Sequence, residues 1–130
     1  MSAESNLFAG WVAIILGFLA GAVPGLFFWI EEWLGGYGSW RRRLVRLAHI
    51  SFFGLGFINV LFALSIPYLG LAADTPLLGW SSTLLIGGVI AMPAVCYLSA
   101  WRLSFRHLFF IPATCMVLGV ALFLWEGFLR

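Results

Sequence analysis

Four long apolar segments, separated by short polar and turn-forming stretches, limit what this chain can fold into. They cover residues 7–30, 44–66, 77–101 and 108–129. An α-helix rises 1.5 Å per residue, so segments of this length reach across the roughly 30 Å hydrocarbon core of a bilayer. The pattern predicts an all-α integral membrane protein with four transmembrane helices.

The composition agrees with a membrane location. Hydrophobic residues make up 63% of the 130 residues and charged residues only 9%, whereas soluble domains are about 45–50% apolar and about 25% charged. So few polar side chains cannot cover a water-facing exterior, and most of the surface must therefore face lipid. We expect a single membrane domain over residues 1–130, with the lipid bilayer as its main partner and no nucleic-acid partner.

The arginines predict the orientation of the helices. The first and third connections carry six of them: Arg41, Arg42, Arg43, Arg46, Arg102 and Arg106. Elsewhere the chain has only Arg130. Positive residues collect on the cytoplasmic side of membrane proteins. This predicts an up-down-up-down bundle with cytoplasmic Arg-rich loops and both termini outside, as a multi-pass protein of a bacterial-type inner (plasma) membrane.

Acidic residues occur near some of these arginines. Residues 31–40, EEWLGGYGSW, combine turn-forming residues with aromatic rings and predict a loop at the membrane interface. Within this loop, Glu31 and Glu32 precede the arginine cluster, and we expect surface ion pairs between them. Glu126 precedes Arg130 by four residues, which is the favourable order for an ion pair along a helix.

Glycines recur at helical spacing in the first two apolar segments. Gly17, Gly21 and Gly25 are four residues apart, which is the spacing that lets two membrane helices approach closely. Gly56 falls on the same side of the second segment as His49. We interpret these four glycines as helix-packing positions. Packing inside the bundle is the favoured reading, and a contact face for a partner protein is the alternative.

His49 lies inside an apolar segment, where an ionisable residue is costly unless it is paired, and is therefore a candidate functional site. His107 lies at a similar predicted depth, just before the fourth segment. Two histidines on different helices can ligate a b-type haem. Asn59, on the same segment as His49, is a further candidate for binding a haem or a quinone. The alternatives are that His49 bonds a neighbouring helix and that His107 faces lipid headgroups.

Other chemistry has weaker support. Met92 with Cys96, and Cys115 with Met116, combine thioether and thiol groups, which are ligands for Cu(I). Buried methionines and cysteines are also ordinary space-filling residues, so we predict no metal site. The sequence contains no recognisable nucleotide-binding loop or nucleophile triad, and we predict no catalytic residues.

These features predict a non-catalytic accessory subunit of a larger membrane complex or oligomer. The complexes that we consider for it are respiratory or electron-transfer complexes. The chain is small, and it has few polar groups within its spans and little protein outside them. A b-type haem- or quinone-binding redox membrane anchor that uses His49 is the alternative from a different class. A small transporter is the third reading.

Overall fold

The computed structural model describes residues 3–72 and 74–130; these residues are mostly helical and contain no strand. The long helices are α1 (Ala3–Gly25), α2 (Trp40–Tyr68), α3 (Pro76–Trp101) and α4 (Phe110–Leu124). Two 3-10 helices, η1 (Trp33–Gly35) and η2 (Leu103–Phe109), precede α2 and α4, and a π-helical turn, η3 (Trp125–Leu129), follows α4. Counting α4 with its two flanks, four helices are long and apolar enough to cross a membrane, so this part of the prediction is confirmed.

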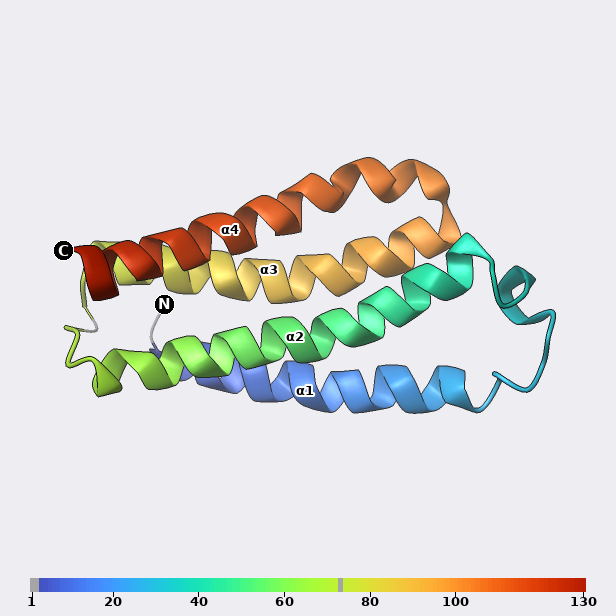
Figure 1. Ribbon diagram of the computed structural model, residues 1–130, viewed down its shortest axis with the longest axis horizontal. Helices are drawn as coiled ribbons and strands as arrows, with labels where there is room; N and C mark the ends of the chain where they lie inside the picture. The colour runs from blue at the N-terminus through green and yellow to red at the C-terminus, as the bar shows by residue number, and fades with distance from the viewer. Residues whose placement is uncertain (1–2, 73) are drawn as a thin grey trace.

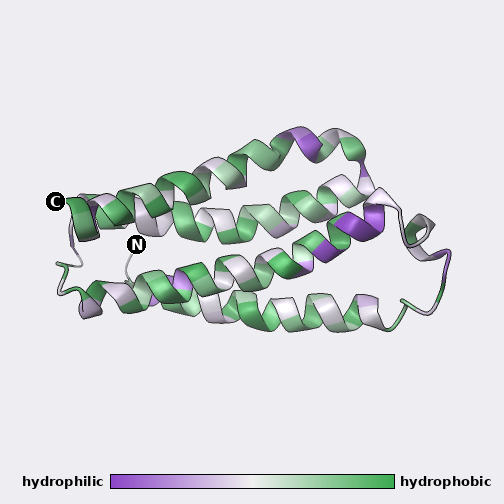
Figure 2. Ribbon diagram, in the orientation of Figure 1, coloured by the Kyte–Doolittle hydropathy of each residue, from purple (hydrophilic) through white to green (hydrophobic). Residues whose placement is uncertain are grey.

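The helices pack in chain order, α1 against α2, α2 against α3 and α3 against α4 (Figure 1). The α1–α2 and α3–α4 connections lie at one end of the bundle. The α2–α3 connection lies at the other end, where α1 begins and η3 finishes (Figure 1). Hydrophilic residues gather at the first of these ends (Figure 2), and we call it the arginine end because α2 begins there with Arg41, Arg42 and Arg43. A core cluster joins α2, α3 and α4: Phe62, Ile66, Leu78, Leu85 and Met116.

The first helix ends earlier than its apolar segment predicts. The segment continues to residue 30, but α1 stops at Gly25, and residues 26–29 form turns. Pro24 has no backbone N–H to donate and its ring crowds the preceding helical turn, so the regular helix ends beside it. The helix also begins earlier than expected. Asn6, which precedes the predicted segment of residues 7–30, lies within α1 and is fully buried.

The second helix begins four residues before its predicted span. Ser39 is the N-cap residue, and its side chain accepts a hydrogen bond of 3.2 Å from the backbone N–H of Arg42. Serine is a favoured N-cap because it satisfies one of the unpaired N–H groups of the first turn. The helix ends at Tyr68, and Gly70 follows with a positive φ of 64°, as is common where a helix stops.

The last two helices keep their prolines inside. Pro93 lies within α3 and Pro112 in the first turn of α4, where a missing N–H is tolerated. At the end of the chain, Arg130 bonds Glu126 at 2.8 Å, as the spacing of the two residues predicts. The expected pairing of Glu31 and Glu32 with the arginines does not occur. Within the described ranges the Glu126–Arg130 pair is the one ion pair present.

The backbones of α1 and α2 approach each other closely at Gly10 and Gly56. A Cβ atom placed on Gly10 would lie 2.7 Å from the Gly56 carbonyl oxygen and 2.6 Å from Cγ2 of Val60. A Cβ on Gly17 would lie 3.0 Å from the Phe53 ring. Gly25 behaves differently, since a Cβ there would meet no atom within 4 Å. The packing face therefore includes Gly10, which the GxxxG spacing alone does not mark, and leaves Gly25 outside.

Candidate functional site

His49 projects from α2 toward α1 and fits against a glycine. Its Nδ1 lies 2.8 Å from the carbonyl oxygen of Gly17. Because a carbonyl oxygen can only accept, Nδ1 carries a proton, and Nε2 is an acceptor whenever the ring is neutral. The ring occupies the place that a side chain on Gly21 would need, since a Cβ there would lie 2.8 Å from Nδ1. The GxxxG spacing of α1 therefore makes room for an imidazole.

A cavity of about 330 Å³ lies beside this ring, between α1 and α2. It is lined by Ala20, Gly21, Pro24, Phe28, Val45, Arg46, His49 and Ile50. We call it the His49 cavity. No hydrogen-bond partner of Nε2 is found in the part of the chain that the structure describes. The cavity volume is near the lower limit of roughly 300–1,000 Å³ for small-molecule sites.

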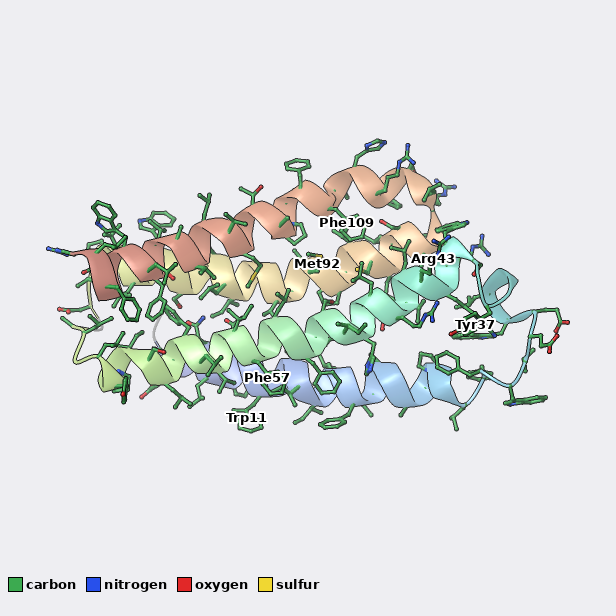
Figure 3. All side chains as sticks on the ribbon, viewed as in Figure 1. Trp11, Tyr37, Arg43, Phe57, Met92 and Phe109 are labelled. Atoms are coloured by element: carbon green, nitrogen blue, oxygen red, sulfur yellow. The ribbon has the colours of Figure 1, made fainter. Side chains whose placement is uncertain are left out.

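A second, smaller cavity of about 200 Å³ lies next to the first and has a more polar lining. Phe28, Tyr37, Arg42 and Arg46 line it, and we call it the arginine cavity. The two cavities share Phe28 and Arg46. Figure 3 places Tyr37 and Arg43 at this end of the bundle. The two cavities together form the candidate site.

The structure does not bring the two histidines together. His107 lies in η2, is exposed, and lines neither cavity. The His49 cavity has walls only from α1, α2 and the turns after α1. A b-type haem held between two imidazoles needs both rings to point into one pocket. His49 and His107 do not form such a pair in this arrangement.

Asn59 lies in a different place, a buried polar network that joins α1, α2 and α3. Nδ2 of Asn6 donates to Oδ1 of Asn59 at 2.7 Å and to the Ser82 carbonyl oxygen at 3.4 Å. The Ser82 hydroxyl donates to Oδ1 of Asn6. Nδ2 of Asn59 donates to the carbonyl oxygens of Leu55, at 2.9 Å, and Leu85, at 3.2 Å. All side-chain N–H donors of both asparagines are therefore used within the protein, and none remains for a cofactor.

Sequence reasoning missed Asn6 and Ser82 as partners of Asn59. One signal was available for Asn6, because it lies four residues before Gly10 and eleven before Gly17, on the face of α1 that packs against α2. Nothing in the sequence marked Arg42 as buried. It lies between two other arginines, Arg41 and Arg43, which are exposed in the structure.

The two cysteines of the Cu(I) alternative lie on different helices, Cys96 in α3 and Cys115 in α4. The described ranges contain no cluster of three or more His, Cys, Asp or Glu residues that could hold a metal ion. Cys96 and Cys115 are both free, one buried and the other half-buried. A Cβ on Gly88 would overlap the Met116 side chain, so this methionine fills space between α3 and α4.

No protein-family model matches the chain. Comparison with curated proteins gives no match, and comparison with solved structures also gives none.

Proposed function

We propose that this protein is a non-catalytic accessory subunit of a larger complex in a bacterial-type inner membrane, and that respiratory or electron-transfer complexes are the class to test first. Its four helices cross the membrane up-down-up-down, with the arginine end in the cytoplasm and both termini outside. The orientation is supported by the six arginines at that end, against Arg130 at the other.

The observation that carries this proposal is the use of the polar groups inside the bundle. Asn6, Asn59 and Ser82 bond one another and nearby carbonyl groups, and Ser81 donates to the Gly119 carbonyl oxygen at 2.7 Å. Interhelical hydrogen bonds of this kind hold membrane helices together. A transport route needs polar groups that a substrate can reach, and these groups are occupied by the protein itself.

The outer surface supports a role among other membrane components. α4 lies at the edge of the row of helices (Figure 1) and its apolar side chains, such as Val117 and Phe110, are largely exposed. A groove of about 450 Å³, lined mainly by apolar residues of α1 and α3, runs along another face. Surfaces of this kind suit contact with lipid chains and with neighbouring transmembrane helices.

A quinone-binding redox anchor is the second candidate function, and one observation favours it. In the described ranges Nε2 of His49 has no hydrogen-bond partner. His49 also lines a cavity that is lined by the cationic Arg46. A quinol hydroxyl can donate a hydrogen bond to such an imidazole nitrogen. In this candidate the anchor binds the redox ligand without catalysing a reaction by itself.

One preparation tests both candidates. We expect the tagged protein, extracted from its own membranes in mild detergent, to migrate on native gels far above the mass of one chain, with defined partners. We expect His49→Ala to leave the visible absorbance and the quinone content of this assembly unchanged. In this proposal any haem or quinone is bound by the partner subunits and not by His49. Loss of haem absorbance or quinone on His49→Ala, in an assembly that persists, would favour the redox anchor. Migration as an isolated chain would contradict the accessory role.

The orientation has its own test with reporter fusions. We expect fusions within residues 31–44 and 101–107 to report a cytoplasmic location. Fusions within residues 68–76 and at either terminus should report the opposite side; residues 1, 2 and 73 of these segments lie outside the described residues. The physical reason is the cost of translocating the Arg-rich connections. An outside location for the segment around Arg41 would reject the proposed orientation.

A further inference from the structure

The arginine end carries a concentration of positive charge, and among the described residues Glu31 and Glu32 of the same connection form no ion pair with it. Arg41, Arg42 and Arg43 lie in the first turn of α2, and Arg46 lies one turn later. The N-terminus of a helix is itself positive because its first N–H groups are unpaired. The described parts of the chain contain no ion pair at this end. An anion bound here would relieve repulsion among these charges.

Arg42 differs from its neighbours because it is buried, with only 4% of its surface exposed. It donates a hydrogen bond to the Ile30 carbonyl oxygen, and its guanidinium carbon lies 5.4 Å from the centre of the Trp33 ring. Its Nε–H has no acceptor among the described residues. A buried charged group with an unused donor is costly unless something pairs with it. Arg42 lines the arginine cavity, so an anion in that cavity would lie beside its charge.

The loop before α2 builds the outer wall of this cavity in a defined shape. Leu34, Gly35 and Gly36 have positive φ values of 55°, 86° and 92°, and a positive φ is uncommon for leucine. The Ser39 hydroxyl donates to the Leu34 carbonyl oxygen at 2.7 Å and so ties the loop to the start of α2. The resulting fold brings the Tyr37 ring to 5.0 Å from the guanidinium carbon of Arg46.

The neighbouring His49 cavity favours a phospholipid as the source of the anion. Its lining continues from the shared residues Phe28 and Arg46 onto apolar side chains such as Val45 and Ile50. A free phosphate ion would make no favourable contacts with an apolar cavity, whereas a phospholipid has both a phosphate and a hydrocarbon part. Basic pockets between membrane helices are suited to anionic lipid headgroups.

We propose that these two cavities form a binding site for one anionic phospholipid. Arg42 and Arg46 bind its phosphate in the arginine cavity, because guanidinium groups match phosphate oxygens in geometry as well as charge. The glycerol part and the beginning of an acyl chain lie in the His49 cavity, against Val45 and Ile50. This site is independent of the protein partners proposed above.

Arg43 supplies a matched control for the test. It lies in the same helical turn as Arg42 and carries the same charge, but it is exposed and lines neither cavity. Purified protein in phosphatidylcholine-containing micelles would be titrated with phosphatidylglycerol, and bound lipid counted by native mass spectrometry. We expect one retained phosphatidylglycerol, about fivefold or more weaker retention in Arg46→Gln, and nearly unchanged retention in Arg43→Gln.

A second variant covers the case in which Arg46→Gln does not fold. Arg42→Lys keeps the charge but removes the Nε–H and the planar geometry, so it should also weaken retention of phosphatidylglycerol. Equal weakening by Arg46→Gln and Arg43→Gln would mean diffuse attraction to the charged surface and would overturn the proposal. Equal retention of phosphatidylcholine would overturn it too. Displacement of the lipid by millimolar inorganic phosphate would instead indicate a site for a soluble anion.

Discussion

Gly10→Ile is expected to be among the most damaging substitutions in the bundle. A Cβ at this position would lie 2.7 Å from the Gly56 carbonyl oxygen and 3.1 Å from the Val60 backbone nitrogen. Backbone atoms cannot rotate out of the way, so α1 and α2 must separate along their contact. Overpacking of this kind costs about 1–3 kcal/mol and occasionally more, and we expect the upper part of that range. Unfolding in mixed detergent micelles would measure the loss.

Two other glycines of α1, Gly21 and Gly25, provide comparisons with Gly10 within the same helix. Gly21→Ile should be less damaging, because the obstacle is the His49 ring, which can move if it gives up its bond to the Gly17 carbonyl oxygen. A Cβ at Gly25 meets no atom within 4 Å, so Gly25→Ile should have little effect. The expected order of destabilisation is therefore Gly10, Gly21 and then Gly25. Equal losses at all three positions would show that helix propensity, and not contact with α2, sets the effect.

The features that sequence predicts correctly depend on local physical rules. The length and apolarity of each segment are enough to predict four candidate spans. The Glu126–Arg130 pair is also local, because a separation of four residues places both side chains on one face of a helix. Pro112 near the start of a helix follows in the same way, since the first turn does not use its missing N–H.

The exact helix ends were less predictable, because hydropathy does not distinguish a helix from an apolar turn. Residues 26–30 are as apolar as the helix before them, but Pro24 and Gly25 end α1. The start of α2 depends on the Ser39 cap, which lies in a segment assigned from the sequence to an interfacial loop. Each of these two helix ends depends on one or two residues. Hydropathy averaged over a long window does not detect them.

The candidate site was only half predictable, because its contacts join residues far apart in the chain. The position of His49 within an apolar segment marked it as a functional candidate, but nothing in the sequence indicated that Gly21 makes room for its ring. His107 has a similar predicted depth, but it is exposed in η2 and lines neither cavity of the candidate site. Depth along a helix is readable from sequence, whereas the direction of a side chain around the bundle depends on which helices become neighbours.

Asn59→Ala is expected to produce a loss of stability almost as large as that of Gly10→Ile. The change removes the acceptor of the 2.7 Å bond from Asn6 and two donors that bond the Leu55 and Leu85 carbonyl oxygens. Leaving a buried polar group unsatisfied costs about 1–3 kcal/mol, although single interhelical bonds in membranes average only about 0.6 kcal/mol. With Asn6 losing a partner at a fully buried position, we expect a loss of about 2 kcal/mol, measured by unfolding in mixed micelles.

A double-mutant cycle separates the network from the simple loss of side-chain volume. Once Asn59 is replaced by alanine, Asn6 has already lost one of its partners, so adding Asn6→Ala should cost less than it does in the wild type. A coupling energy of about 0.5–2 kcal/mol between the two sites would support the network. Thr83→Val is the matched control, because its exposed hydroxyl bonds the Gly79 carbonyl oxygen of its own helix and no other described residue, and it should change stability little. Additive losses at Asn6 and Asn59 would mean that each asparagine acts alone, and that the link between α1, α2 and α3 contributes little to the fold.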